Sequence, residues 1–332
     1  MTDIAAGRKR KSNAAVTDQD HLEQHRVELT AYCYRMLGSA FEAEDAVQET
    51  MLRAWRGLEK FDGRSSLRTW LYKIATNICI DMLKGRQRRA LPIDLGPSSR
   101  ADDTLAEPLP EATWIEPIPD GRVIPIGGDP AEQVELKDSV RLAFVTALQH
   151  LPPKQRTVLI LREVLRWSAI EVAGLLETSV ASVNSALQRA RATLETKEEQ
   201  IVRPAEQIGK DEKDLLARYV DAFERYDIDS FVSLLHQDAT QAMPPYPMWL
   251  VGPEEISRWM LGAGIGCKGS RLVPLEANGA PAFAQYRLSP DGGFEAFSIH
   301  VPEFSDGRIC RANYFLDTKL FSLFGLPERL DA

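Results

Sequence analysis

Hydrophobic residues recur at helical spacing along two separate stretches of the chain, from His21 to about Arg89 and from Ala131 to about Thr196. In the first stretch, for example, Leu67, Leu71 and Ile74 are three or four positions apart and share one face of a helix. Each stretch therefore predicts a small all-α domain, with three or four packed helices in the first.

The pattern changes towards the C-terminus. An apolar-periodic helix is predicted from Asp214 to Tyr226, and short segments of strand character follow it, broken by glycine and proline. These segments are Phe231 to Leu235, Ala239 to Met243, Arg271 to Leu275, Ala280 to Leu288, Phe294 to His300 and Arg308 to Leu316. A helix followed by a run of strands predicts an α+β domain.

Polar segments separate these blocks. Residues 1–20 have no apolar period and are expected to form a disordered tail. Residues 91–130 are acidic and rich in proline, so we expect an extended linker rather than a folded element, and a second linker is expected at 198–212. The predicted fold is therefore multidomain, with two all-α domains at 21–90 and 131–197 and an α+β domain at 213–328.

The net charge of −8 is unevenly distributed. Residues 1–90 contain 16 Lys and Arg against 12 Asp and Glu, and residues 136–200 contain 9 against 7. Residues 91–135 contain 2 against 10, so two mildly basic blocks flank an acidic linker. The acidic total therefore does not exclude nucleic-acid binding by the helical domains.

Cysteine spacing and hydropathy exclude several other classes. Cys33, Cys79, Cys267 and Cys310 lack the CxxC spacing of zinc or redox sites, so we expect reduced core thiols and neither a metal nor a cofactor. No apolar run approaches the roughly 18 residues that span a bilayer. We therefore expect a cytoplasmic protein that does not bind membranes.

The second helical block contains the pattern of a helix-turn-helix. Ser168 and Glu171 form an S-x-x-E capping box that predicts a helix start, and Ser179 is placed to cap a second helix. Val180, Val183, Ala186, Leu187, Ala190 and Leu194 are expected to face inward. The outward residues suit base edges and phosphates in a major groove, and they are Ser182, Asn184, Ser185, Gln188, Arg189 and Arg191.

Two observations limit this interpretation. An amphipathic helical hairpin with a solvated polar face would show the same pattern. In addition, Glu177 occupies a turn position where helix-turn-helix sequences often have glycine, so its backbone must adopt the turn without glycine's freedom.

The first helical block carries an acidic stripe followed by a basic and aromatic stretch. Glu42, Glu44, Asp45, Gln48, Glu49 and Arg53 are on the polar sides of a helix whose other side is Ala46, Val47, Thr50 and Trp55. Such a stripe suits a basic partner helix, although an isolated charge cluster is more often a solvated face. Downstream, Arg64, Arg68, Lys73 and Asn77 are candidates for contacting nucleic acid, whereas we expect Trp70 to be a core aromatic.

At this point the chain resembles a known family. AEDAVQETMLRAW and FDGRSSLRTWLYKIATN are similar to region 2 of bacterial extracytoplasmic-function (ECF) sigma factors, and LPPKQRTVLILREV with SVNSALQRARATL resembles region 4. WIEPIPD at Trp114 to Asp120 resembles the linker of a subgroup with a fused C-terminal domain. DLLARYVDAFERYDIDSFVSLLHQDA and FLDTKLFSLFGLP are similar to that domain, which is SnoaL-like with a cone-shaped NTF2 fold.

The resemblance implies partners and residue roles. Core RNA polymerase would be bound by Asp45, Gln48, Glu49, Leu52 and Arg53. The minus-ten promoter element, melted to single strands, would be contacted by Phe61, Arg64, Ser65, Ser66, Arg68, Lys73 and Asn77. The duplex minus-thirty-five element would be read by the outward residues of the helix-turn-helix. The implied function is promoter-specific transcription initiation modulated by the C-terminal domain, with no separate anti-sigma factor required.

The C-terminal domain is expected either to hold a small-molecule ligand or to have a filled core and a protein interface. Residues expected to line a pocket are Tyr219, Phe223, Met243, Tyr246, Trp249, Trp259, Phe283, Tyr286, Phe297 and His300. Related domains include cyclases and isomerases that use an acid-base pair, for which the candidates are His236, Asp238, His300 and Asp317. No motif pairs a histidine with a carboxylate, so we expect no enzyme. The alternatives are a ligand-responsive DNA-binding regulator that acts without polymerase and a SnoaL-like cyclase or isomerase.

Overall fold

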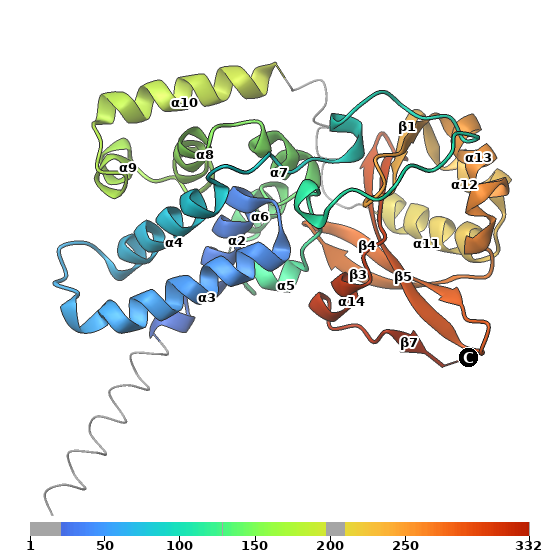
Figure 1. Cartoon of the computed structure of the whole chain (residues 1–332), viewed down its shortest axis with the longest axis horizontal. Helices are drawn as coiled ribbons and strands as arrows, with labels where there is room; N and C mark the ends of the chain where they lie inside the picture. The colour runs from blue at the N-terminus through green and yellow to red at the C-terminus, as the bar shows by residue number, and fades with distance from the viewer. Residues whose placement is uncertain (1–20, 128, 197–209, 332) are drawn as a thin grey trace, which may run out of the picture. The chain divides into compact units, whose positions relative to one another are not determined.

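The computed structural model describes residues 21–127, 129–196 and 210–331 (Figure 1). The predicted tail at 1–20 and most of the predicted linker at 198–212 are outside these residues. The chain divides into two compact units that are each built from several segments. Among the described residues, the first comprises 21–86, 121–127, 129 and 151–193, and the second comprises 87–120, 130–150, 194–196 and 210–331.

The first unit is helical, as predicted. Its helices are α2 (Arg26–Leu37), α3 (Ala40–Gly57), α4 (Leu67–Leu83), α8 (Pro153–Leu159), α9 (Ala169–Leu175) and α10 (Val180–Glu195). Gly38 ends α2 in the left-handed conformation with φ 70°, and the Ser39 side chain then accepts a hydrogen bond from the Glu42 N–H at the start of α3. Helices α2, α3 and α4 bury Tyr32, Cys33 and Val47 among them.

A buried arginine joins the two halves of this unit. The Arg156 guanidinium, on α8, donates to the carbonyl oxygens of Met36 at the end of α2 and of Leu151. Rings also stack across this boundary, with the centroids of Tyr72 and Trp167 5.1 Å apart. Residues 151–193 therefore pack directly against the helices of the first block.

The second unit is built on a seven-stranded sheet. Its strands are β1 (Leu235–Ala242), β2 (Trp249–Val251), β3 (Arg271–Ala277), β4 (Ala280–Leu288), β5 (Phe294–Ser305), β6 (Arg308–Phe315) and β7 (Arg329–Leu330). They run in the order β2-β1-β6-β5-β4-β3, with β7 paired to β5. Strands β1 and β6 pair in parallel, and the other neighbouring strands pair antiparallel. Asn278-Gly279 and Asp306-Gly307 close two hairpins with positive φ at both residues, the geometry of type I′ turns.

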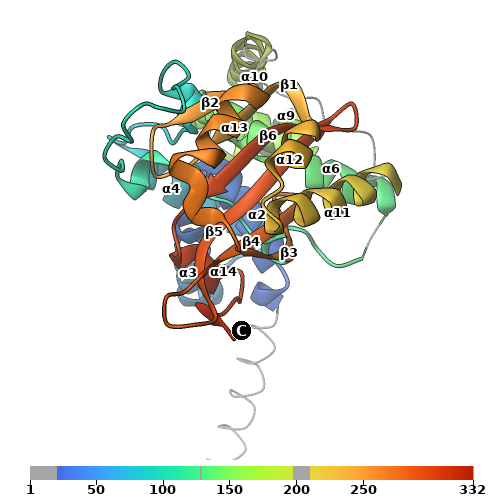
Figure 2. The ribbon, with the colours of Figure 1, turned by 90° about the vertical axis from the view of Figure 1, so that its right-hand side faces the viewer.

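Helices cover one face of this sheet (Figure 2). They are α11 (Lys210–Glu224), α12 (Ile228–Ser233) and α13 (Pro253–Leu261), and their apolar sides form one core with the strands through Phe223, Phe231 and Ile256. Helix α14 (Lys319–Leu323) follows the last long strand. Helices α6 (Pro130–Asp138) and α7 (Leu142–Gln149) also belong to this unit, and α5 (Asp120–Val123) is at the boundary between the units in sequence.

One local prediction for this unit is largely wrong. Residues Phe231 to Leu234, predicted as part of a strand, instead form the second half of α12 and its C-cap, because Asp227 caps the helix by accepting from the Ser230 N–H and its hydroxyl. Leu235 is the first residue of β1. The short edge strand β2 was not predicted.

Cys33 and Cys79 are buried, but Cys267 and Cys310 are half-buried, so only the first pair consists of core thiols.

The predicted extended linker is also wrong, because its second half is folded against the sheet. Trp114, Ile115 and Ile118 are all buried. Residue Pro119 forms an antiparallel bridge with Ala277, and Ala90 forms a parallel bridge with Trp114. The prolines reduce the number of N–H groups that must be paired there, so apolar residues between them can be buried at low cost.

One side chain holds this segment in place. The Asn278 Oδ1 accepts from the Ile118 N–H at 3.0 Å, and its Nδ2 donates to the Val140 carbonyl at 2.8 Å. The backbone N–H of Asn278 also donates to the Ile118 carbonyl. A single turn residue therefore joins the linker, the segment between α6 and α7, and the hairpin. Within the described residues, no helix is both long and apolar enough to cross a membrane.

We predict that Asn278→Ala destabilises the second unit. The substitution leaves the buried Ile118 N–H and Val140 carbonyl without partners, which costs about 2 kcal/mol or more. The Tm should fall by about 5 °C in calorimetry of the full chain. Asp306→Ala is the control, because it also truncates the first residue of a type I′ turn to alanine, at an exposed site. An equal fall in Tm in both variants would mean that backbone strain in the turn causes the effect, and it would contradict the prediction.

Candidate functional site

Helix α3 carries the residues expected to bind a large protein partner. Ala43, Ala46, Val47, Thr50 and Ala54 are buried on its inner side. The five residues expected at the interface lie on the other sides, where Asp45, Gln48, Leu52 and Arg53 are exposed and Glu49 is half-buried. The Arg53 Nε donates to Glu49 Oε1 at 2.6 Å, an i,i+4 pair that orders the two side chains.

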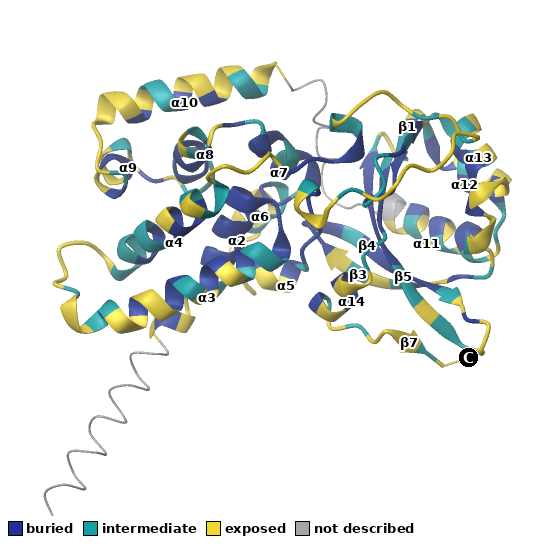
Figure 3. Ribbon diagram, in the orientation of Figure 1, coloured by how far each residue is buried: buried dark blue, intermediate teal, exposed yellow. Residues whose placement is uncertain are grey.

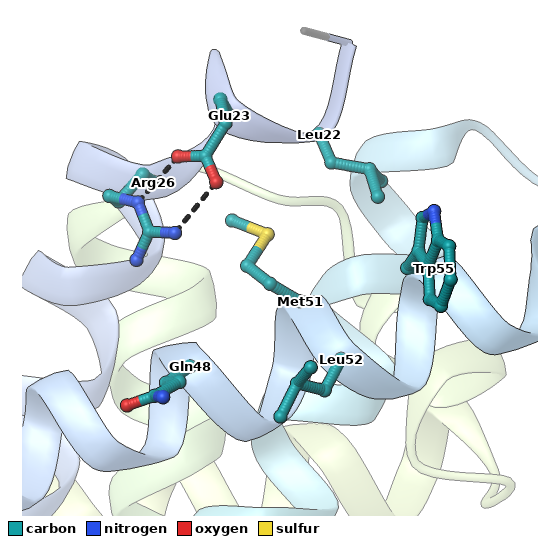
Figure 4. A pocket seen from close by; sticks show the side chains of 7 residues that line it. All are labelled: Leu22, Glu23, Arg26, Gln48, Met51, Leu52 and Trp55. Atoms are coloured by element: carbon teal, nitrogen blue, oxygen red, sulfur yellow. Dashed lines mark hydrogen bonds and ion pairs between the residues drawn. The ribbon is translucent and has the colours of Figure 1, made fainter. Parts of the chain in front are cut away.

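An apolar groove runs along this helix (Figure 4). It has a volume of about 250 Å³ and is lined by Leu22, Glu23, Arg26, Gln48, Met51, Leu52 and Trp55. The four α3 residues are at positions i, i+3, i+4 and i+7, so they form one continuous face of the helix. Arg26 donates to both carboxylate oxygens of Glu23 at 2.5 and 2.7 Å and closes one end of the groove.

Trp55 corrects the prediction that placed it on the inner side of the helix. The inner position is taken by Ala54, and Trp55 is 59% exposed beside Leu52, which is 41% exposed. Two large exposed apolar side chains beside a groove are typical of a surface that a partner covers. Their i, i+3 spacing on the polar side was a signal in the sequence that our pattern analysis missed.

The loop before α4 presents several of the expected nucleic-acid contacts. Arg64, Ser65 and Ser66 are exposed, and the Arg64 side chain makes a surface ion pair with Asp62 at 2.8 Å. The Ser66 Oγ accepts from the Thr69 N–H and so begins α4. Phe61, by contrast, is half-buried because its ring packs on Trp70, with the centroids 5.0 Å apart. Trp70, expected in the core, is itself half-buried.

On α4, two expected contacts are already engaged. The Arg68 Nε donates to Glu28 Oε2 at 2.7 Å, and its guanidinium lies 5.5 Å from the Trp167 ring centroid. The Lys73 Nζ donates to Glu177 Oε1 at 2.6 Å. Asn77 is exposed. Two cations of this surface are therefore paired within the first unit, one of them with the turn of the helix-turn-helix.

The helix-turn-helix has the predicted start and turn. The Glu171 N–H donates to Ser168 Oγ and the Ser168 N–H donates to Glu171 Oε2, which is the complete capping box. Hydrogen bonds to Ser168 lower the pKa of the Glu171 carboxyl, and burial does not contribute to this lowering. Glu177 adopts φ 52°, so this non-glycine residue does occupy the left-handed region.

Helix α10 presents the expected reading residues. Ser182, Asn184, Gln188, Arg189 and Arg191 are exposed along it (Figure 3). Ser185 is half-buried and accepts from Arg189 Nη1 at 2.6 Å, while Arg191 pairs with Glu163 at 2.6 Å. The exposed polar face has the composition that base edges and phosphates require.

Two apolar residues extend this surface. Val180 was expected to face inward, but it is 39% exposed because it occupies the first turn of α10, where Val183 is the first residue to be buried. Ile170 on α9 is also exposed. Sequence periodicity did not identify either residue, since each lies in the first turn of its helix.

The C-terminal domain contains a cavity of about 330 Å³ between the sheet and its helices. Of the expected residues, Phe223, Met243, Tyr246, Trp259 and Phe297 line it. Tyr219, Trp249, Phe283, Tyr286 and His300 are not among the lining residues, which corrects that part of the prediction. Tyr286 instead packs on Phe321 and donates to the Pro327 carbonyl.

His300 is buried behind the cavity wall. Its Nδ1 lies 2.9 Å from the Tyr219 hydroxyl, and its Nε2 lies 2.9 Å from Gln285 Oε1 and 3.0 Å from Ser298 Oγ. No carboxylate is among these partners. Burial lowers the pKa of His300 from 6.5 to about 3, so the ring is neutral and fully occupied by neutral groups.

The other acid-base candidates do not converge either. The His236 Nδ1 lies 3.9 Å from Asp238 Oδ2, beyond hydrogen-bond range, and Asp238 is exposed. Asp317 accepts from the Lys319 N–H. These contacts stabilise a strand end and a turn, and they give no arrangement of an acid and a base around a shared space.

Comparisons with known proteins match three families to three successive parts of the chain. The Sigma-70 region 2 family matches residues 21–89, the Sigma-70 region 4 family matches residues 141–194, and the SnoaL-like domain family matches residues 216–312. The ECF RNA polymerase sigma factor SigG of Mycobacterium tuberculosis is 47% identical over 319 residues, which is 93% of this chain and 84% of that protein.

Two further relatives match this chain, one over nearly its full length and one over about half of it. SigJ of M. tuberculosis, also an ECF RNA polymerase sigma factor, is 26% identical over 330 residues and 95% of each chain. Its crystal structure matches with a TM-score of 0.60 at 22% identity, covering 94% of this chain and all of that one, and so shares the fold. SigW of Bacillus subtilis is 30% identical over 175 residues, 53% of this chain and 85% of that protein.

We predict that His300 makes the C-terminal domain sensitive to acid. Because its pKa is about 3 in the folded domain and near 6.5 when unfolded, the unfolded state binds the extra proton between these values. Stability should therefore fall as the pH falls from about 6.5, by up to about 1.4 kcal/mol per pH unit. Tm measured from pH 7.5 to 5 should decline less steeply for His300→Gln than for the wild type.

The slopes of Tm against pH can be compared even if His300→Gln is less stable than the wild type at every pH. His236→Gln, at a half-exposed strand position, controls for the loss of a histidine and should keep the wild-type slope. Identical slopes for the wild type and His300→Gln would show that His300 does not carry this dependence.

Proposed function

Because the chain belongs to the family of ECF RNA polymerase sigma factors, we propose that the outward face of α3 binds core polymerase and that the first unit reads promoter DNA. The chain directs promoter-specific transcription initiation through RNA polymerase. The observation that carries the residue-level proposal is the exposed groove of α3, with Leu52 and Trp55 beside it.

The chemistry of this face suits a partner that is both basic and partly apolar. Asp45 and Glu49 supply negative charge at the edge, and Gln48 and Leu52 line the groove. Buried apolar contacts would supply most of the affinity, while the acidic edge would favour a basic helix and exclude wrong partners. Asp45, Gln48, Glu49, Leu52 and Arg53 therefore remain our polymerase-binding set, to which we add Trp55.

Promoter DNA would contact two surfaces of the first unit. Phe61, Arg64, Ser65, Ser66, Arg68, Lys73 and Asn77 would contact the melted minus-ten element, and the exposed side of α10 would read the minus-thirty-five element in the major groove. The Lys73–Glu177 and Arg68–Trp167 contacts hold the two surfaces together. Binding at two separate promoter elements therefore requires these contacts to open, and we propose that association with polymerase drives the opening.

The C-terminal domain would modulate this activity through the linker. Residues 87–120 and 130–150 form one compact unit with the domain, and the Asn278 side chain bonds to Ile118 and Val140 within it. The family match for region 4 begins at residue 141, so the domain holds the segment that leads into that region. A domain that fixes the linker limits where region 4 can be placed on DNA.

We propose that the chain catalyses no reaction of its own, although SnoaL-like domains include enzymes. The support is the arrangement of His300, whose partners are all neutral, and the distance between His236 and Asp238. A cytoplasmic location is proposed because core polymerase and promoter DNA are both there.

The α3 proposal predicts the effect of a double substitution. Leu52→Ala with Trp55→Ala removes two exposed anchors and should weaken binding to core polymerase at least tenfold, because truncating such anchors costs roughly 1–3 kcal/mol each. Binding is measured by fluorescence anisotropy of the labelled full chain. Leu261→Ala is the matched control, since Leu261 is 62% exposed in the C-terminal domain. Unchanged affinity in the double variant would exclude this face as the polymerase site.

The regulatory proposal predicts that removal of the C-terminal domain changes transcription. A chain that ends at Thr196 loses the partners of Ile118 and Val140, so the linker is no longer held. Run-off transcription with core polymerase should differ severalfold between the full and shortened chains. A rise would show that docking restrains initiation, and a fall would show that it supports it. Equal transcription, with core binding retained by both chains, would contradict modulation.

A further inference from the structure

The cavity of the C-terminal domain combines an apolar wall with a few polar groups. Phe223 of α11, Met243, Trp259 and Met260 of α13, and Leu316 supply the apolar surface. The polar side chains in the wall come mainly from the strands and include Gln241, Gln285, Ser298 and Tyr314. A volume of about 330 Å³ is within the range of small-molecule sites.

Among the residues that line this cavity, Gln241 has a buried side chain that the fold leaves without hydrogen-bond partners. It lies on β1 and is 1% exposed, and neither its Nε2 nor its Oε1 has a hydrogen-bond partner among the described residues. Because both ends of the amide are unpaired, exchanging the nitrogen and the oxygen would not change this conclusion. A buried amide without partners is costly, and such groups in native proteins usually serve a ligand or an ordered water.

The neighbouring glutamine shows what a satisfied amide looks like here. The Gln285 Nε2 donates to Ser270 Oγ at 2.9 Å, and its Oε1 accepts from Ser298 Oγ at 2.7 Å. The same oxygen lies 2.9 Å from His300 Nε2, which must donate because the amide oxygen can only accept. The hydrogen-bonding groups of Gln285 are therefore paired within the protein, and the Gln241 amide remains to bind a ligand.

The hydrogen-bonded network behind Gln285 is electrically neutral. The chain from Gln285 through His300 to Tyr219 contains no charged group, and the Tyr314 hydroxyl at its end lies 3.4 Å from that of Tyr219. The charged residues in the cavity wall are Asp103 and Arg287. The Arg287 Nε donates to the Gly266 carbonyl, and its guanidinium lies 4.3 Å from the Phe297 ring centroid. A charged ligand beside Gln241 would lose its hydration, and the neutral network offers it no ion pair.

Part of the linker forms one edge of this cavity. Asp103 and Leu105 are lining residues, although they are more than a hundred positions from the domain's first strand. The linker is held there by backbone contacts, because the Ser99 N–H donates to the Trp249 carbonyl and the Ala101 N–H donates to Glu255 Oε2, both at 2.8 Å. The Trp249 Nε1 donates back to the Gly96 carbonyl at 3.0 Å.

We propose that this cavity binds a neutral, mostly apolar small molecule that carries a hydrogen-bond donor and acceptor side by side, as a lactam or amide does, and that Gln241 pairs with that edge. The guest then contacts Leu105, so that its presence stabilises the linker on the domain. This inference deepens the regulatory role proposed above. Binding measured without polymerase or DNA keeps its failure separate from a failure of that role.

The test uses a matched pair of probes with the full chain. 2-Quinolone presents an adjacent N–H and carbonyl on an apolar bicycle, and N-methyl-2-quinolone lacks the donor. Isothermal titration should show that the wild type prefers 2-quinolone about tenfold. Gln241→Leu should lose this preference, whereas Gln237→Leu, the same change at an exposed position of β1, should retain it.

Two further measurements make the outcome decisive. Without any probe, Gln241→Leu should raise the Tm because it removes an unpaired buried amide. A clear fall in Tm would show that the Gln241 amide already has hydrogen-bond partners in the protein without a ligand. Hydrogen exchange of residues 99–109 should slow when 2-quinolone binds. The proposed site would be overturned if neither probe binds, if both bind with equal affinity, or if the preference for 2-quinolone survives Gln241→Leu. An unchanged rate of hydrogen exchange at residues 99–109 would overturn the coupling of the site to the linker.

Discussion

The architecture of the second unit depends on the way one turn residue satisfies backbone groups from two distant parts of the chain. Asn278 pairs with Ile118 through its side chain and backbone and with Val140 through its amide nitrogen. Without these bonds, the buried backbone of the linker would have to be exposed to water, because unpaired buried N–H and carbonyl groups are costly. The burial of Trp114 and Ile115 follows from that docking. A segment that composition marks as a linker is therefore a structural part of the C-terminal unit.

Residues whose role is decided by their immediate neighbours were predictable from the sequence. The capping box at Ser168 and Glu171, the left-handed Glu177 and the helical first block are all local features, and the structure has them. Residues whose role depends on distant packing were not predictable. Composition could not show that Ile118 would meet Asn278, 160 residues later. Trp55 is a different case, because its i, i+3 spacing from Leu52 indicated the outer side of α3 and the prediction nevertheless placed it on the inner side.

The same limit applies to the candidate sites. Large aromatic and apolar residue types suggested Phe223, Met243 and Tyr246, which line the cavity, but they also suggested Tyr286, which packs elsewhere. The informative residue in that cavity is Gln241, which looks ordinary in the sequence and is unusual only because its surroundings leave it without partners. The Asn-Gly and Asp-Gly pairs at the hairpin turns were a local signal that could have located Asn278 earlier.

The pairing of Lys73 with Glu177 has a consequence for how the protein searches a genome. Affinity for random DNA comes almost entirely from free cations that displace counterions from phosphates. The Lys73–Glu177 and Arg68–Glu28 pairs engage two cations of the first unit that could otherwise contact phosphates. We infer that these pairs weaken the binding of the free chain to random DNA, so that more of the free protein remains available to compete for polymerase. On this inference, the search for promoters follows the association of the chain with polymerase.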